Sequence, residues 1–345
     1  MSKKIRTLLI DDSAFMRKVI SDLMLSDAQI ELIGVAKNGK EGSEMALDLK
    51  PDVVITDMVM PDHDGLYVVN NLMTNLPVPI ILLSSLEKSN NRIFEALEHG
   101  AFEFIDKPDE KVRKDLGNYP LLKLIKQAAH TDISLLKAKQ LAKQNSNQHA
   151  FDANTLYKIV VIGASTGGPG AVEAVITNLP SNLKIPVVIV QHMPARFLET
   201  FAERLNTMSP LQVKLARKGE LLRGGTVYIA PGSGNLIVET HAVTGQIQFN
   251  FTDKQFKEFN EPSIDCFFDS VAEVYGKQSI GVVLTGMGKD GAEGLYKIKQ
   301  AGGYTIAQDE NSSVVYGMPK AAAESGAARQ VVALKQIPGF IVSCL

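Results

Sequence analysis

The segment IVVIGASTGGPG, from Ile159 to Gly170, joins an apolar run to a glycine-rich turn that has Ser165 in its middle. The β-branched run predicts a buried strand, and the turn predicts a junction with a following helix, which is typical of an α/β fold. Two different chemistries use such a junction. A glycine loop can bind a dinucleotide pyrophosphate at a helix N-terminus, whereas a serine in the frame G-x-S-x-G can be an exposed nucleophile.

Length and composition limit the classes of protein to which the chain can belong. Its 345 residues suffice for two domains, and 45% hydrophobic with 21% charged residues is typical of a globular protein. A net charge of −2 gives no broad basic field for nucleic acid, and no apolar stretch approaches the roughly 20 residues of a membrane span. The two cysteines, Cys266 and Cys344, form no disulfide framework. We expect a cytoplasmic protein without a signal peptide, a membrane segment or a nucleic-acid partner.

The stretch from Gln127 to Thr155 divides the chain, because it contains no strand-like run and includes the polar segment QNSNQHA. Short β-branched runs alternate with helical patterns on either side of it, as in parallel βαβ units. We therefore expect a first domain over residues 1–126, a linker over 127–155 and a second domain over 156–345.

The first domain contains five apolar runs, each followed by a helical pattern, and polar residues stand where the runs end. The runs are IRTLLIDD, IELIGVA, DVVITDM, IILLSS and FEFIDKP. Ligands bind beyond the carboxyl ends of such strands, where Asp11, Asp12, Asp57 and Lys107 fall. Three carboxylates brought together repel one another unless a cation lies among them, and an all-oxygen site favours Mg²⁺. A carboxylate can also accept a phosphoryl group. The alternative for Asp12 is that it simply caps the helix that begins near Ser13.

This half resembles the receiver domain of two-component response regulators over residues 3–125. The matching motifs are DDSAFMR, PDVVITDMVMPDHDGL and the Lys-Pro step at Lys107. The resemblance implies a flavodoxin-like (βα)5 fold in which Asp57 is the phospho-acceptor. It also implies that Asp11, Asp12, Asp57 and the Val59 carbonyl hold Mg²⁺, and that the switch residues are Ser84, Phe104 and Lys107. Ser85 is the alternative to Ser84 for the switch hydroxyl, because the loop after this doublet varies in length.

In the second domain, the nucleotide interpretation of the opening segment fails at the positions that test it. A dinucleotide fingerprint requires glycine where Ser165 stands, and it requires an acid at the end of the next strand, where IPVVIVQH ends in His192. A phosphate-binding loop in TGMGKDG fails as well, because the earlier glycine and the hydroxyl after Lys289 are absent.

A nucleophilic serine needs a base, and the base needs an orienting acid. His192 ends the strand that follows the Ser165 strand, and Asp290 follows the strong strand IGVVLT. The other histidine of this half, His241, falls in a turn between two antiparallel strands. Each candidate has a plainer alternative. Ser165 could be a helix cap, and Asp290 could form a D-x-x-E capping box with Glu293. Three rival acids are Asp265, Asp269 and Asp309.

From about Lys158 onward, the chain resembles the catalytic domain of the chemotaxis protein-glutamate methylesterases, the CheB family. The motifs are IGASTGGP, VQHMP, VYIAPG, LTGMGKDGAEGL and AQDENSSVVYGMP. The resemblance implies that Ser165 is the nucleophile, His192 the general base and acid, and Asp290 the residue that orients it. Backbone N–H groups of Thr166 and Met287 are the implied oxyanion donors. The implied fold is a doubly wound, mostly parallel α/β sandwich with a β-hairpin.

The implied reaction is hydrolysis of glutamate methyl esters on chemoreceptors, with deamidation of glutamines as a related activity, under control of a phosphorylated receiver. The implied partners are methylated chemoreceptor cytoplasmic domains and a chemotaxis histidine kinase. Ester hydrolysis needs no cofactor, and Mg²⁺ belongs to the receiver. Two other functions stay open at this point: a non-enzymatic response regulator that binds DNA or protein, and a nucleotide-dependent enzyme that uses the glycine loop.

Overall fold

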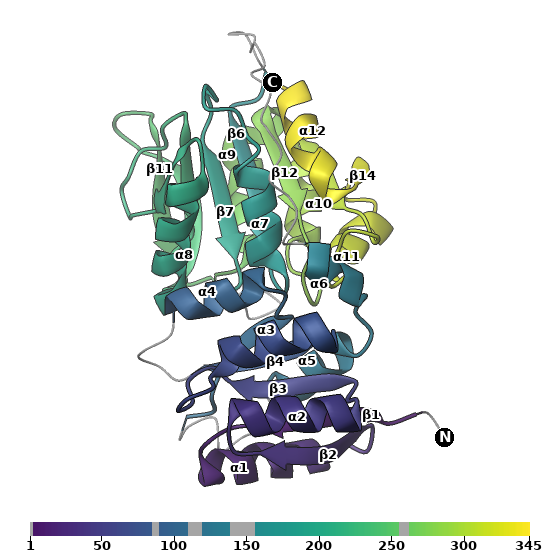
Figure 1. Cartoon of the computed structure of the whole chain (residues 1–345). Coiled ribbons are helices and arrows are strands. Elements are labelled where there is room, and N and C mark those ends of the chain that lie inside the picture. The colour runs from purple at the N-terminus through teal and green to yellow at the C-terminus, as the bar shows by residue number, and fades with distance from the viewer. Residues whose placement is uncertain (1–2, 85–89, 110–118, 139–155, 255–261) are drawn as a thin grey trace. The chain divides into compact units, whose positions relative to one another are not determined.

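The computed structural model describes residues 3–84, 90–109, 119–138, 156–254 and 262–345. The chain forms two compact units, Met1–Ala142 and Lys143–Leu345, and each is built on a parallel sheet (Figure 1). The boundary between the units falls inside the predicted linker. Two helices reach into that stretch, α5 (Leu121–Ala128) and α6 (Ile133–Ala138). Residues 139–155, which include QNSNQHA, lie outside the described residues.

The first unit contains a five-stranded parallel sheet in the order β2-β1-β3-β4-β5, which is the flavodoxin-like order. Its strands are β1 (Ile5–Ile10), β2 (Ile30–Ala36), β3 (Val53–Asp57), β4 (Ile80–Ser84) and β5 (Glu103–Asp106). Its other helices are α1 (Ala14–Leu25), α2 (Gly39–Leu49), α3 (Gly65–Asn75) and α4 (Asn90–Glu98). Strands β3 and β4 are buried along their whole length, as their continuous apolar runs predict.

The cap of α1 differs from the plainer interpretation of Asp12. Ser13 is the N-cap, and its side chain accepts a hydrogen bond from the Met16 amide. Asp11 in turn accepts from the Ser13 amide at 2.9 Å. Asp12 is therefore not needed to cap this helix.

The second unit contains a seven-stranded parallel sheet in the order β14-β13-β12-β6-β7-β9-β8 and a separate antiparallel hairpin. The strands of the sheet are β6 (Ile159–Ala164), β7 (Val187–Gln191), β8 (Gln212–Leu215), β9 (Thr226–Ile229), β12 (Ser279–Val283), β13 (Tyr304–Gln308) and β14 (Gln330–Val332). The hairpin consists of β10 (Asn235–Thr240) and β11 (Ile247–Thr252). His241 lies in its turn, as predicted.

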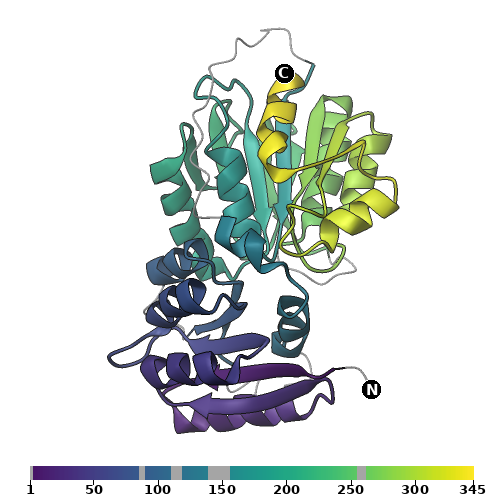
Figure 2. The same ribbon diagram turned by 45° about the vertical axis from the view of Figure 1, so that its right-hand side comes forward.

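Helices cover both faces of this sheet, which makes the fold doubly wound. They are α7 (Gly168–Ile176), α8 (Ala195–Met208), α9 (Ile264–Tyr275), α10 (Ala292–Gln300), α11 (Met318–Glu324) and α12 (Ile337–Ser343), with 3-10 turns at Gly276–Gln278 and Leu334–Gln336. Figures 1 and 2 show α7, α8 and α12 on one face, and α9 and α10 on the other. The predicted fold class is thus confirmed.

The position of the site follows from where the winding reverses. The chain leaves β6 for α7 on one face, and it leaves the neighbouring strand β12 for α10 on the other. In open parallel sheets, such a reversal opens a crevice beyond the carboxyl ends of the two strands. Ser165 and the segment after Val283 lie at this point.

The helices of the described residues lack the combination of length and apolar character that crossing a bilayer requires.

Candidate active site

Ser165 directly follows β6 and lies against the segment that follows β12. Its amide donates to the Thr285 carbonyl at 3.0 Å. A Cβ added at Gly286 would lie 2.7 Å from the Ser165 Cβ, so only glycine permits this approach. Helix α7 is capped by Gly167, which has a φ of 73° and no side-chain cap bond. The interpretation of Ser165 as a helix cap is therefore wrong.

His192 follows β7, the strand on the other side of β6. Its amide donates to the Ala164 carbonyl at 3.0 Å, which places His192 beside Ser165 at the same edge of the sheet. Gln191, which is 1% exposed, connects the two positions. Its Nε2 donates to the carbonyls of both Ser165 and His192, at 3.0 Å each. The backbone of the serine is therefore held to that of the histidine.

The side chains of His192 and Asp290 form a hydrogen bond of 2.8 Å between Nε2 and Oδ2. The Asp290 side chain is 1% exposed and that of His192 is 14% exposed, so the pair is largely shielded from water. Because Nε2 is engaged, Nδ1 is the ring nitrogen left for a serine proton. Within the described part of the chain, no hydrogen bond joins Ser165 Oγ to His192. Such catalytic bonds are often loose before substrate binds.

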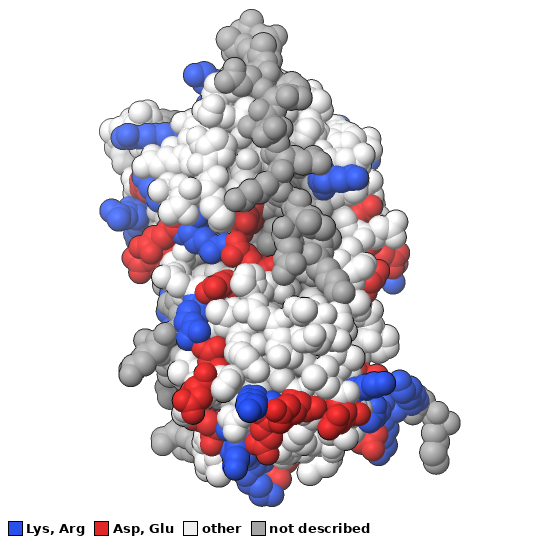
Figure 3. Space-filling model, in the orientation of Figure 1, with Lys and Arg blue, Asp and Glu red and all other residues white. Residues whose placement is uncertain are grey.

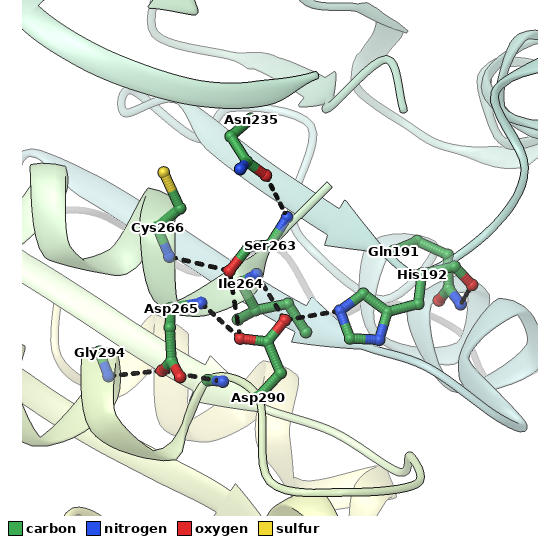
Figure 4. A network of polar contacts seen from close by, with 10 residues as sticks. Gln191, His192, Asn235, Ser263, Ile264, Asp265, Cys266, Asp290 and Gly294 are labelled. Carbon is green, nitrogen blue, oxygen red and sulfur yellow. Dashed lines mark hydrogen bonds and ion pairs between the residues drawn. The ribbon is translucent and has the colours of Figure 1, made fainter. Parts of the chain in front are cut away.

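Asp290 also binds the start of α9, a contact that the sequence does not reveal. Its carboxylate accepts from the amides of Ile264 and Asp265, each at 2.9 Å. The Ser263 hydroxyl is a further neighbour at 3.4 Å. Figure 4 shows the aspartate between the histidine ring and the helix N-terminus. Helix α10 is capped by Gly291 without a side-chain bond, so the predicted capping box of Asp290 and Glu293 does not form.

These contacts set the charge on Asp290. Burial raises the pKa of its carboxyl, but the His192 hydrogen bond and the amides of Asp265 and Ile264 outweigh burial and hold the pKa below its usual value. An ionised Asp290 can keep the imidazole of His192 oriented and stabilise it when it becomes positively charged.

The three rival acids have other partners. Asp265 accepts from the amides of Gly291 and Gly294 at the start of α10. Asp269 is buried and pairs with Lys297 at 2.7 Å. Asp309 binds the backbone and side chain of Ser312.

The two oxyanion candidates lie close to Ser165, because Thr166 is the next residue and Met287 follows Gly286, which packs on the serine. The Thr166 carbonyl accepts from the Thr285 hydroxyl at 3.0 Å. The peptide that carries the Thr166 amide is held through its Ser165 carbonyl, which accepts from Gln191 Nε2 at 3.0 Å. Met287 lies between Gly286, packed on Ser165, and Gly288, which has a φ of 83°. Both backbone segments therefore lie next to Ser165, and the role of their amides as oxyanion donors stays a prediction.

Sequence reasoning missed three residues that support the site. Gln191 links the serine and histidine backbones, and Ser263 and Asn235 hold the start of α9, where the Asn235 Oδ1 accepts from the Ser263 amide at 2.8 Å. The one available signal was a polar side chain inside the strong strand that ends in Gln191, because a buried glutamine needs partners there.

The first unit gathers its predicted residues at the carboxyl edge of its own sheet. Asp11, Asp12 and Asp57 each offer an oxygen, and the three oxygens lie within 4.8 Å of one another. Lys107 Nζ lies 2.7 Å from both Asp11 Oδ2 and Asp57 Oδ2. A cluster of carboxylate oxygens with one exposed member, Asp12, fits a hard divalent cation that keeps water ligands.

Charge in this cluster is costly. Burial raises the pKa of Asp57 to about 6, although the ammonium of Lys107 opposes the shift. Burial lowers the pKa of Lys107, but the carboxylates of Asp57 and Asp11 outweigh it and raise the pKa above its usual value. The Asp57 shift thus reflects its burial, and the Lys107 shift reflects the two carboxylates beside it.

The switch candidates lie on the two neighbouring strands. Ser84 ends β4 and is 1% exposed, and its carbonyl accepts from the Lys107 amide at 2.8 Å. Phe104 is buried within β5. Val59 lies two residues after Asp57, and its amide donates to the Asp57 carboxylate at 3.2 Å. Ser85, the alternative to Ser84, lies outside the described residues.

Comparison with known proteins identifies the family. A family model described as CheB methylesterase matches residues 160–341. The chain belongs to the CheB methylesterase family. A second model, the response regulator receiver domain, matches residues 7–115. The curated relatives include the protein-glutamate methylesterase/protein-glutamine glutaminase of Halalkalibacterium halodurans, which is 40% identical over 347 residues and 99% of each chain. The protein of the same name from Thermotoga maritima is 41% identical, with 98% of each chain covered.

A solved CheB structure supports the assignment of the second unit. The catalytic domain of the Thermotoga maritima CheB methylesterase is 43% identical, with a TM-score of 0.53, and the match covers 55% of this chain and 99% of that domain. The non-enzymatic and nucleotide-dependent alternatives are not favoured. Basic and acidic side chains are also interspersed on the face drawn in Figure 3, unlike a continuous basic surface for DNA.

Proposed function

We propose that the second unit hydrolyses glutamate γ-methyl esters, and the amides of glutamine side chains, on the cytoplasmic domains of chemoreceptors, with Ser165 as nucleophile. The observation that carries this proposal is the buried 2.8 Å hydrogen bond between His192 and Asp290, next to Ser165 on the adjacent strand end. A nucleophile, a base and an orienting acid at one edge of a sheet are the parts of a serine hydrolase.

The first step is attack of Ser165 Oγ on the ester carbonyl. His192 Nδ1 takes the hydroxyl proton, while its Nε2–H stays bound to the Asp290 carboxylate. The C–O bond from serine forms as the carbonyl π bond opens, which places a negative charge on the former carbonyl oxygen. The amides of Thr166 and Met287 stabilise that charge.

The second step releases the alcohol. The His192 proton passes to the methoxy oxygen, the bond between the acyl carbon and that oxygen breaks, and methanol departs. A water molecule then attacks the acyl-serine, with His192 again as base, and glutamate and Ser165 are regenerated. For a glutamine substrate, ammonia leaves in place of methanol, and the acyl-enzyme is the same.

The direct test is methanol release from methylated receptor membranes. We expect the Ser165→Ala variant to lose release, and the Ser325→Ala variant, altered at an exposed serine at the end of α11, to retain it. Unchanged release by Ser165→Ala would disprove the serine mechanism. Trapping of a radiolabelled acyl group on the wild-type chain alone would support it independently.

We further propose that the first unit controls this activity by accepting a phosphoryl group on Asp57 from a chemotaxis histidine kinase in the cytoplasm. Asp11, Asp12, Asp57 and the Val59 carbonyl would hold Mg²⁺, which would neutralise charge on the transferred oxygens. Lys107 already contacts the Asp57 carboxylate and would bind a phosphoryl oxygen in the same place. Ser84 and Phe104 on the neighbouring strands would respond to the phosphoryl group.

A small phosphodonor such as acetyl phosphate tests this control without the kinase. We expect it to stimulate methanol release by the wild type and by Asp48→Asn, which alters an exposed acid on α2. The Asp57→Asn variant should keep the basal rate and show no stimulation. Stimulation of that variant would contradict the assignment of Asp57.

A further inference from the structure

Helices α9 and α10 begin side by side, and each N-terminus is bound by an aspartate from the other helix's segment (Figure 4). Asp290, just before α10, accepts from the amides of Ile264 and Asp265 at the start of α9, each at 2.9 Å. Asp265, in turn, accepts from the amides of Gly291 at 2.9 Å and Gly294 at 2.6 Å, at the start of α10. These reciprocal hydrogen bonds satisfy backbone amides that have no partner within their own helix.

The backbones meet closely enough that two glycines are required. A Cβ at Gly294 would lie 2.6 Å from the Phe268 Cβ and 3.1 Å from the Asp265 Cα. Gly291 has a φ of 90°, and a Cβ there would lie 2.7 Å from Ile264 Cγ2. Such contacts leave the two helix starts little room to shift separately.

We propose that Asp265 is a positioning residue for ester hydrolysis, because it holds the segment that carries Asp290 at the correct distance from His192. The inference rests on the proposed function of the Ser165 site. Helix α10 has no side-chain cap of its own at Gly291, so Asp265 supplies the acceptor from outside. A shift of this segment would move Asp290, and with it the histidine ring.

Asp265 acts as a hydrogen-bond acceptor rather than as a charge. Both α10 amides bind the same oxygen, Oδ1, so an asparagine amide oxygen can occupy the same position. Burial raises the pKa of Asp265 to about 7, and the nearby charges of Asp290 and Glu293 add to the shift against the opposing amides. The raised pKa disfavours the charged form, and the carboxyl oxygen accepts hydrogen bonds in either form.

Asp269 provides a matched control on the same helix, one turn further along. It also connects α9 to α10, because Lys297 donates to its carboxylate at 2.7 Å. It is buried, at 8% exposure, whereas Asp265 is partly exposed. Its contact lies away from Gly291 and the Asp290 segment. Loss of Asp269 should therefore weaken helix packing without moving the triad.

The experiment compares Asp265→Ala, Asp265→Asn and Asp269→Ala in the full chain, with methylated receptor membranes as substrate. We expect kcat of Asp265→Ala to fall by about tenfold or more with KM within about twofold, because misplaced catalytic groups slow the chemical step. Asp265→Asn and Asp269→Ala should keep kcat within about twofold, even where melting temperature falls. Equal kcat losses in Asp265→Ala and Asp269→Ala, or a loss in Asp265→Asn as large as in Asp265→Ala, would overturn the proposal.

Amide hydrogen exchange at Gly291 and Gly294 tests the same contact without any substrate. Exchange at both amides should accelerate by about tenfold or more in Asp265→Ala and stay near the wild-type rate in Asp269→Ala. Unchanged exchange in Asp265→Ala would overturn the proposed hold on α10. If the wild-type chain released no methanol, the proposed function would fail, and the exchange rates would still decide whether Asp265 fixes this segment.

Discussion

Replacing Gly168 by alanine should damage the active site indirectly, because the added carbon displaces the buried side chain of Gln191. A Cβ at Gly168 would lie 2.2 Å from Oε1 and 2.9 Å from Cδ and Nε2 of the Gln191 side chain. Gln191 is buried and cannot swing into solvent. It must therefore withdraw from the carbonyls of Ser165 and His192, to which it donates.

The size of the effect follows from these contacts. Each of the two lost hydrogen bonds contributes about 1 kcal/mol, and inserting a carbon into a packed site costs about 1–3 kcal/mol. Alanine is favoured over glycine in a helix, which offsets about 1 kcal/mol of this destabilisation. The net loss for Gly168→Ala is about 3 kcal/mol. In a unit of this size, the melting temperature falls by about 2–4 °C per kcal/mol, so we expect a decrease of about 6–12 °C.

Calorimetry of the full chain and steady-state methanol release measure the two consequences. Gly339→Ala is the matched control, because Gly339 lies in α12 and a Cβ there meets nothing within 4 Å. The control should keep its kcat and melt about 2–4 °C higher, because alanine is favoured over glycine in a helix by about 1 kcal/mol, whereas Gly168→Ala should lose both stability and kcat. A Gly168→Ala chain that melted with the wild type and retained kcat would refute the proposed role of Gln191.

Three further predictions concern the buried carboxylates. Asp290→Asn should reduce kcat by about 10⁴-fold, as in a serine triad whose aspartate becomes an asparagine, and a loss below tenfold in methanol release would contradict an orienting acid. Burial raises the pKa of Asp57 to about 6, so in EDTA the folded chain holds a proton that the unfolded chain has already released between about pH 4 and 6. The free energy of unfolding that this group contributes therefore falls as pH rises from about 4 to 6, and it stays constant at higher pH. Urea unfolding should show a loss over this range that is about 3 kcal/mol larger in the wild type than in Asp57→Asn. At pH 7, Mg²⁺ at 100 times its Kd should raise the stability of the wild type by about 2.7 kcal/mol, and an equal rise in Asp12→Asn would argue against the acidic site.

The sequence predicted the strands and the residues at their ends, because apolar β-branched runs mark buried parallel strands and their last residues meet at one edge. Asp57 and Lys107 were placed in this way, and the structure brings them into contact. Ser165, His192 and Asp290 follow three neighbouring strands, and the hydrogen bond of His192 to Asp290 agrees with that expectation.

Local rules failed where long-range contacts decide. The frame from Asp290 to Glu293 fits a capping box, but Asp290 binds α9 instead, whose first residue lies 26 positions earlier in the chain. Likewise, Ser165 fits a helix cap, yet the left-handed Gly167 begins the helix two residues later. Spacing along the chain carries no information about which other helix packs against a loop, so these contacts needed the three-dimensional structure.

The pairing of β6 with β12 also affects when the active site can assemble during synthesis of the chain. Strand β6 pairs with β12 across a long sequence separation, as in the pair Ile159 and Ser279. Its other partner, β7, follows it much more closely in the sequence. A ribosome delivers the first unit, then β6 to β9, well before β12 exists, and such distant pairing forms late. Until then, Ser165 lacks both the Thr285 carbonyl and Asp290. The chain therefore emerges from synthesis with its first unit already made, and the surroundings of Ser165 are among the last parts to be assembled.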